Sequence, residues 1–175
     1  MISKKICLVG DFGVGKTSLI RRFVDAQFSD QYLSTVGVKI SRKVVEITPN
    51  NQPEKLKLQM LIWDLEGSNK FKAIAPAYLQ GARGTIVVAD VTRIDTIDRV
   101  SGHIYNFLEI NPQGFLVVAL NKSDLVDEEK LSKLLEMVQS QAQDRVIGIY
   151  PTSAKTGIHV DLIFETLACA IIEKE

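Results

Sequence analysis

Short apolar runs alternate along this chain with stretches in which apolar residues recur every three or four positions. An unbroken apolar run is typical of a strand buried on both faces, and the wider spacing is typical of a helix with one buried face. The strand-like runs are residues 6–9, 85–89, 115–120 and 145–150. The helix-like stretches lie around residues 19–24, 93–110, 127–142 and 158–173, with Asp127 and Gly157 as expected boundary residues.

Two further strands are predicted where residues 38–48 and 55–63 are rich in Val, Ile and Leu. The turn-forming cluster from Pro49 to Pro53 separates them, so they should form an antiparallel hairpin. The alternation of strands and helices elsewhere predicts an α/β fold, with a mostly parallel sheet, helices on both faces and the hairpin at one edge. Ligands of such sheets bind at the carboxyl ends of the strands, so functional side chains are expected there.

Residues 10–18 stand between the first strand-like run and the first helix. They spell Gly-Asp-Phe-Gly-Val-Gly-Lys-Thr-Ser and match the phosphate-binding pattern G-x-x-x-x-G-K-[ST] in the strand–loop–helix context that it requires. The glycines let backbone N–H groups wrap a polyphosphate at the start of a helix. Lys16 would place an ammonium against the β- and γ-phosphates, and the Thr17 hydroxyl would bind Mg²⁺. A glycine-rich turn with a chance Gly-Lys-Thr is the alternative, and the flanking strand and helix count against it.

The strand predicted at residues 55–63 ends in polar groups suited to the same ligand. Asp64, at the end of residues 55–63, would hold Mg²⁺ through a water, and the N–H of Gly67 would meet a γ-phosphate. Asp64-Leu65-Glu66-Gly67 alone is a weak signal, because a strand ending in a polar turn has the same composition.

Asn121-Lys122-Ser123-Asp124 follows residues 115–120, and Thr152-Ser153-Ala154-Lys155 follows residues 145–150. The Asp124 carboxylate can accept hydrogen bonds from the N1–H and 2-amino group of guanine, whereas adenine has no donor at either place. Asn121 would tie its loop to the phosphate-binding loop, and the Lys122 stem would lie along the base. Ser153 would brace Asp124, while the N–H of Ala154 would meet guanine O6. A helix N-cap would explain Ser123 and Asp124 equally well, but it would not explain why they occur in a chain that also carries the phosphate-binding pattern.

These motifs, in this order, resemble the Ras superfamily of small GTPases over essentially the whole chain. Trp63-Asp64 and Gly10-Asp11 are most similar to the Rab and Rho branches. The resemblance implies a P-loop NTPase fold: one small G-domain over residues 1–175, with a six-stranded sheet. It also implies GTP or GDP and Mg²⁺ as ligands, and a protein effector or regulator that contacts switch segments at residues 29–37 and 64–78.

The resemblance also assigns residues. The implied metal ligands are Thr17, Thr35 and Asp64, and the implied catalytic residues are Lys16, Thr35, Gly67 and Ser68. The implied nucleotide-binding residues are Phe12, Gly13, Val14, Gly15, Lys16, Thr17, Ser18, Phe28, Tyr32, Thr35, Gly67, Asn121, Lys122, Asp124, Ser153, Ala154 and Lys155. Phe28 would pack against guanine and Tyr32 would close over the phosphates, although a core phenylalanine and an exposed loop tyrosine are the plain alternatives.

Two departures from the family bear on hydrolysis. Ras-like proteins usually carry glutamine after the Gly67 position to orient the attacking water, and this chain has Ser68, which is too short to span that gap. Phe12 stands where small residues are usual and should crowd both a water-orienting group and an activator's arginine finger. Glu66 also replaces a commonly small residue. We therefore expect slow GTP hydrolysis, and the leading hypothesis is a slow switch. The alternatives are a hydrolysis-deficient interaction module and an ATP-using P-loop enzyme, against which Asp124 argues.

Composition narrows the partners. Lys plus Arg number 21 and so do Asp plus Glu, so no bulk attraction to nucleic acid or anionic membrane is implied. No leader and no C-terminal lipidation motif is evident, so we expect a cytoplasmic chain without its own lipid anchor, the alternative being that a lipidated tail has been removed. A monomer is expected. His103 and His159 are expected to be surface or capping residues.

Two smaller questions concern packing. Cys7 and Cys169 are expected to be buried thiols, the latter on an apolar stripe with Leu162, Phe164 and Leu167. Apolar residues near the hairpin edge at 39–47 and at Trp63, Phe71 and Tyr78 fit a contact surface and the core about equally.

Overall fold

The computed structural model describes residues 1–30, 37–67 and 75–175 of this chain. The strands are β1 Ile2–Val9, β2 Val38–Ile47, β3 Leu56–Leu65, β4 Gly84–Asp90, β5 Phe115–Asn121 and β6 Val146–Pro151. The α-helices are α1 Lys16–Asp25, α2 Ala75–Leu79, α3 Ile94–Asp98, α4 Val100–Ile110, α5 Glu128–Gln141 and α6 Val160–Glu173, and Ser123–Leu125 form one 3₁₀ turn.

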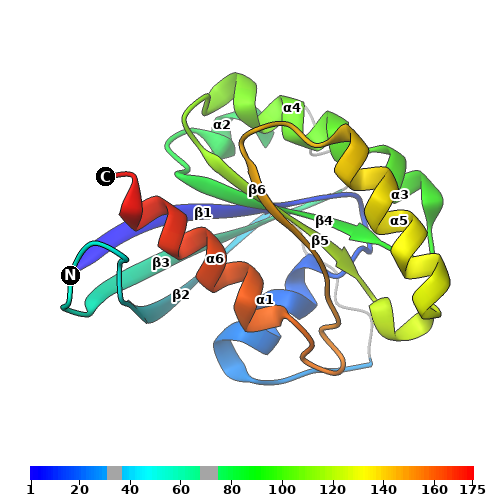
Figure 1. The fold of residues 1–175 in the computed structure, drawn as a ribbon, viewed down its shortest axis with the longest axis horizontal. Coiled ribbons are helices and arrows are strands. Elements are labelled where there is room, and N and C mark those ends of the chain that lie inside the picture. The colour runs from blue at the N-terminus through cyan, green and yellow to red at the C-terminus, as the bar shows by residue number, and fades with distance from the viewer. Residues whose placement is uncertain (31–36, 68–74) are drawn as a thin grey trace.

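Within these residues the six strands form one sheet in the order β2-β3-β1-β4-β5-β6. Only the edge pair β2 and β3 is antiparallel, while the pairs β3–β1, β1–β4, β4–β5 and β5–β6 are parallel. The predicted α/β fold with one antiparallel edge hairpin is therefore confirmed. Because the carboxyl ends of the parallel strands meet at one edge of the sheet, the loops that follow them gather there (Figure 1).

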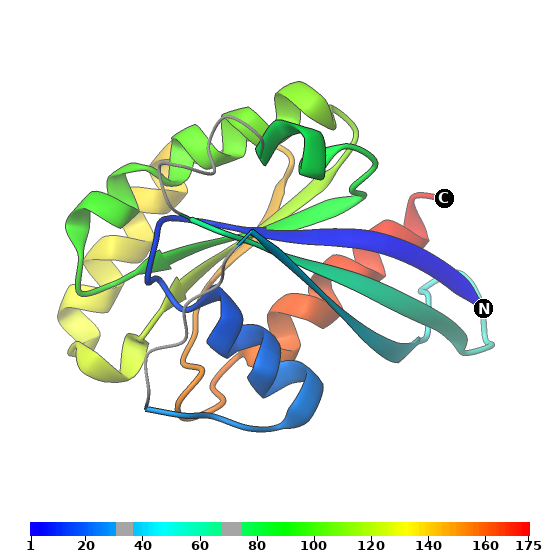
Figure 2. The same ribbon diagram turned by 180° about the vertical axis from the view of Figure 1, so that it is seen from behind.

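Helices cover both faces of the sheet (Figures 1 and 2). One core lies under α1 and α6, where Leu19, Phe23 and Phe164 are buried and the last two rings stack with centroids 4.1 Å apart. The other core lies under α2 to α5, around Ile104 and Phe107. The side chains of residues 86–89 in β4 and 115–120 in β5 enter the two cores in turn, which explains why these stretches are apolar at every position.

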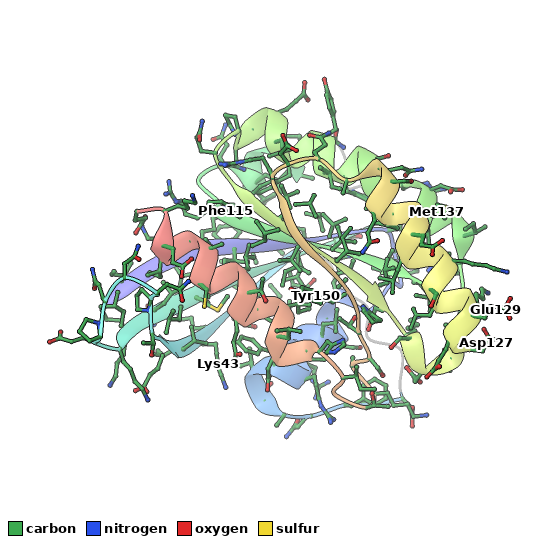
Figure 3. All side chains as sticks on the ribbon, in the orientation of Figure 1. Lys43, Phe115, Asp127, Glu129, Met137 and Tyr150 are labelled. Carbon is green, nitrogen blue, oxygen red and sulfur yellow. The ribbon has the colours of Figure 1, made fainter. Side chains whose placement is uncertain are left out.

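Most element boundaries match the sequence prediction, and the differences have local causes. The strand predicted at residues 6–9 begins at Ile2, because residues 2–5 pair with β3 alone and can therefore be polar. The stretch predicted as one helix over 93–110 is two helices that meet at Arg99. Asp127 caps α5 as expected, since its side chain accepts a hydrogen bond of 2.8 Å from the Lys130 N–H; Figure 3 shows Asp127 and Glu129 at the start of that helix.

The packing predictions hold for Cys7 and Cys169 but not for Leu162. Cys7 is fully buried, and burial raises the pKa of its thiol to about 12. Cys169 is half-buried and packs against the core under α6. Leu162, predicted on the same stripe, is instead 38% exposed. At 100° per residue, positions 162 and 164 point to nearly opposite sides of a helix, so they cannot share its buried face.

The possible contact surface on the hairpin side also divides into two parts. On β2, Ile40 and Val44 are 49% and 45% exposed, on the sheet's outer edge. Trp63 and Tyr78 are half-buried, with ring centroids 6.2 Å apart, and pack against the core. The exposed apolar residues of this region therefore lie on β2, and Phe71 lies outside the described residues.

Candidate nucleotide-binding site

A cleft of about 320 Å³ opens at the carboxyl ends of the parallel strands. It is walled by the P-loop, the start of α1, the end of β5 and the loop after β6. Of the predicted nucleotide-binding residues that the structure describes, all line this cleft except Val14 and Ser153, whose side chains are fully buried. Ser29, Asp30, Leu65 and Leu125 also line it and were not predicted.

Lys16 lies at the centre of the phosphate-binding loop and is only 6% exposed. Its ammonium donates hydrogen bonds to the carbonyls of Gly10, at 2.9 Å, and Asp11, at 3.0 Å. Burial lowers the pKa of Lys16 to about 8, although the nearby Asp64 and Asp11 carboxylates oppose this shift. A buried ammonium of this kind is placed to gain strongly from an anionic ligand.

Thr17 and Asp64 bring two oxygen ligands together beside Lys16. The Thr17 hydroxyl donates a hydrogen bond of 2.5 Å to the Asp64 carboxylate, which is almost completely buried. Oxygen donors of this hardness suit Mg²⁺, which takes one or two protein ligands and completes its shell with waters and phosphate oxygens. These two side chains therefore fit a magnesium ion bridging the protein to a polyphosphate.

Gly15 and Asn121 join the phosphate-binding loop to the end of β5. The Asn121 amide donates a hydrogen bond of 2.9 Å to the Val14 carbonyl, as the sequence predicts. Gly15 has φ +101°, and a Cβ there would lie 2.3 Å from the Asn121 nitrogen, so only glycine allows this approach. The Thr152 hydroxyl in turn donates to the Asn121 oxygen at 3.2 Å, which fixes the orientation of the amide.

The predicted base-recognition residues also lie together. The Ser153 hydroxyl donates a hydrogen bond of 2.8 Å to the Asp124 carboxylate, so the expected brace is present. Ala154 is 4% exposed and lines the cleft, together with Asp124 and Phe28. The Asp124 carboxylate is thus held by a residue that follows a different strand, β6. We call this part of the cleft lining the base end and the part around Lys16 and Thr17 the phosphate end.

Comparison with known proteins agrees with this geometry. The model of the Ras family matches residues 5–173. The chain belongs to the Ras family of small GTPases. Ras-related protein Rab-10 from Caenorhabditis elegans is 36% identical over 97% of this chain and 81% of its own length. GTP-binding protein ypt4 from Schizosaccharomyces pombe is 33% identical over 97% and 72%, and Ras-related protein Rab-13 from Rattus norvegicus is 35% identical over 97% and 80%. The chain is thus similar to Rab proteins in particular.

Lys122 of this Ras-family chain makes two contacts across the cleft wall. Its ammonium donates to the Gly13 carbonyl at 3.0 Å and pairs with the Asp90 carboxylate at 2.8 Å. Burial raises the pKa of Asp90, but hydrogen bonds from Lys122 and Thr92 outweigh that effect and hold it below its ordinary value. Lys122 has a positive φ of 64°, a strained conformation that these contacts stabilise.

The side that should face the γ-phosphate departs from the family pattern. Phe12 is 49% exposed and lines the cleft, and its carbonyl accepts a hydrogen bond of 2.8 Å from Arg93. Glu66 exchanges two hydrogen bonds with Gly37: its N–H donates to the Gly37 carbonyl at 2.9 Å, and its carboxylate accepts from the Gly37 N–H at 2.8 Å. Phe12 therefore lies in the cleft, whereas Glu66 binds Gly37 and is not among the residues that line the cleft.

Some predictions concern residues outside the described ranges. Tyr32, Thr35 and Ser68 lie there, as do residues 31–36 of the first predicted switch segment and 68–74 of the second. Their expected roles stay predictions.

Two residues near the site, His103 and Arg93, make contacts that the sequence did not predict. His103, expected at the surface or as a cap, is half-buried, and its ring nitrogen Nε2 donates to the Asp11 carboxylate at 2.9 Å. Arg93 stands in no motif, so no sequence signal marked its contact with Phe12. His159 is exposed at the N-cap position of α6, but its side chain makes no capping hydrogen bond and Nδ1 instead contacts the Pro151 carbonyl at 2.8 Å. Among the described residues, no helix is long and apolar enough to span a membrane.

Proposed function

We propose that this chain is a guanine-nucleotide switch that binds GTP and GDP with Mg²⁺ and hydrolyses GTP slowly. The observation that carries the proposal is the pairing of two residue sets in one cleft. Lys16, Thr17 and Asp64 suit a magnesium-bound polyphosphate. Asp124, held by Ser153, suits a guanine base at the other end.

Guanine selectivity follows from the charge of Asp124. Its carboxylate would accept the N1–H and the 2-amino group of guanine, two charge-assisted hydrogen bonds. With adenine in the same place, the carboxylate would lose its water without gaining a donor. This argues against the ATP-using P-loop enzyme.

Slow hydrolysis follows from the groups around the γ-phosphate position. Lys16 and the Gly67 N–H would stabilise charge on the transferred phosphoryl group, and Thr35 would bind Mg²⁺ in the GTP state. The side chain at position 68 is the serine that replaces the water-orienting glutamine. The exposed ring of Phe12 occupies space at the mouth of the cleft that an activator's arginine would need.

A second candidate function is a nucleotide-loaded interaction module with no turnover. Phe12 favours it, because its exposed ring adds bulk to the lining of the cleft in which the phosphates would lie. The two functions share the same binding site and differ only in whether bound GTP is hydrolysed.

We also propose that residues 1–175 act as one G-domain, monomeric, whose switch segments at 29–37 and 64–78 change a protein partner's affinity. The exposed Ile40 and Val44 on the outer strand β2 adjoin the first of these segments and suit a protein partner.

Competition for the cleft tests the proposal. With Mg²⁺ present, GTP and GDP should displace a fluorescent guanine nucleotide at least roughly 100-fold more effectively than ATP does. Asp124→Asn should abolish most of that preference and favour xanthine, whose C2 carbonyl can accept from the new amide. Asp144→Asn, an exposed carboxylate elsewhere, is the matched control and should change nothing. Equal affinity of wild-type protein for GTP and ATP would contradict the guanine assignment.

A further inference from the structure

The Asp11 side chain connects the phosphate-binding loop to a helix that does not line the cleft. Its carboxylate accepts a hydrogen bond from His103 at 2.9 Å and forms an ion pair with Arg99. His103 lies in α4, and Arg99 is the N-cap residue of the same helix, four positions earlier. This spacing places both side chains on one face, one helical turn apart. Residue 11 as a whole is only 8% exposed.

These two contacts decide the charge of the carboxylate. Burial raises the pKa of Asp11, but the hydrogen bonds from His103 and Arg99 outweigh that effect and bring it below its ordinary value. Asp11 is therefore an ionised group whose nearly buried position depends on its partners from α4. Removing the partners would leave a buried charge uncompensated, which favours a different position of the loop.

The backbone of the same residue lies where the phosphate-binding groups meet. The Asp11 carbonyl accepts a hydrogen bond from the Lys16 ammonium at 3.0 Å. A Cβ on Gly67 would come within 2.7 Å of the Asp11 carbonyl carbon and the Phe12 nitrogen, so the Gly67 backbone packs directly on this peptide. A shift of Asp11 would therefore move the surface that supports both Lys16 and Gly67.

We propose that Arg99 and His103 are positioning residues for the γ-phosphate contacts, acting through Asp11. They hold the peptide between Asp11 and Phe12 against Gly67, whose N–H would meet the γ-phosphate. This inference rests on the proposed function. It predicts a differential effect: loosening Asp11 should weaken the binding of a triphosphate more than that of a diphosphate, because GDP makes no γ-phosphate contact.

Dissociation rates of two nucleotides test the proposal. The dissociation rates of GDP and of a non-hydrolysable GTP analogue are measured with Mg²⁺ present, for wild-type protein and for the Arg99→Ala, His103→Ala double variant. Release of the analogue should accelerate roughly tenfold more than release of GDP, as expected for loss of one charge-assisted hydrogen bond. Arg99→Lys, which retains the charge, should restore part of the difference. Tyr105→Phe, which removes only an exposed hydrogen bond to Glu109 from the same helix, is the matched control and should match wild type.

Asp11→Asn keeps the size of the side chain and removes its charge, so it carries the test if the double variant does not fold. It too should accelerate analogue release selectively. An equal acceleration of both nucleotides, or none in either, would overturn the positioning role and leave the contacts as stabilising ones only. Failure of wild-type protein to bind either nucleotide would instead overturn the proposed function, so the two failures are distinguishable.

Discussion

The two ends of the cleft differ in how closely they follow the family pattern. At the base end, Asn121, Asp124 and Ser153 have the family's residue types, and hydrogen bonds between side chains and backbone hold them. At the phosphate end, Lys16, Thr17 and Asp64 keep the pattern, but Phe12 lines the cleft where the family usually has a small residue, and Glu66 replaces another small residue just before Gly67. The comparison indicates that nucleotide binding and nucleotide turnover have separate requirements in this chain.

The separation has a physical reason. Base recognition needs only a few hydrogen-bonding groups on rigid strand ends. Asn121, Asp124 and Ser153 are groups of this kind, because they lie at or just after the ends of β5 and β6. Hydrolysis additionally needs a water and stabilising charges placed around the γ-phosphate, where one bulky side chain is enough to interfere. Under the proposed function, Asn121, Asp124 and Ser153 would meet the first requirement, and the substitutions at positions 12 and 68 bear on the second.

The largest effect is expected from Lys16→Ala, because both ends depend on holding the polyphosphate. Loss of the ammonium should weaken GDP and GTP binding by roughly 100-fold or more, the value of one or two charge-assisted hydrogen bonds. Isothermal titration with Mg²⁺ measures the loss. Lys133→Ala removes an exposed lysine paired with Glu129 and should leave affinity unchanged. Unaltered affinity in Lys16→Ala would mean that the phosphates bind elsewhere.

The next effect concerns turnover alone. Phe12→Gly combined with Ser68→Gln should raise the single-turnover rate of GTP hydrolysis by about tenfold. This is less than the roughly 10²- to 10⁴-fold effect of a well-placed general catalytic group, because the new glutamine would be imperfectly placed. GDP affinity should change little, because neither substitution touches the base end. If the rate stays at the wild-type value, the missing catalytic groups lie elsewhere in the chain or in a partner.

A pH dependence should appear at the phosphate end. Since the pKa of Lys16 is lowered to about 8 in the absence of nucleotide, the ammonium fraction falls as pH rises through that value. A polyphosphate binds the charged form, so affinity should fall by about tenfold between pH 7 and pH 9, and binding above pH 8 should take up a proton. Titrations in buffers of different ionisation enthalpy detect that proton. Binding without proton uptake would show that Lys16 stays charged throughout.

The smallest effect on affinity is expected at the base end of the cleft. Ser153→Ala removes the hydroxyl that donates to Asp124, and should weaken guanine-nucleotide binding by about 3- to 10-fold, the value of one hydrogen bond. The hydrolysis rate of bound GTP should not change. A lower rate with unchanged affinity would contradict the separation of the two ends. Ser140→Ala, which removes an exposed hydroxyl from α5, is the control.

The sequence predicted the sheet and the cleft well because both are encoded locally. Continuous apolar runs marked β4 and β5, and the motif residues directly follow strand ends that must converge. The break between α3 and α4 was not predictable, since apolar spacing continues across it. The contacts of Arg93 with Phe12 and of His103 with Asp11 were also missed. They join positions more than eighty residues apart through side chains outside any motif, so only the folded chain brings them together.

Single-turnover hydrolysis with Mg²⁺, using protein loaded with GTP and with ATP as a control, tests the central claim most directly. The account predicts tight retention of GTP, none of ATP, and hydrolysis at or below roughly 10⁻⁴ to 10⁻³ per second, the intrinsic range of such GTPases. A rate within that range indicates a working switch, and GTP that stays intact for many hours indicates the loaded module. Rapid hydrolysis, on the order of one per second without an activator, or equal retention of ATP, would contradict the account.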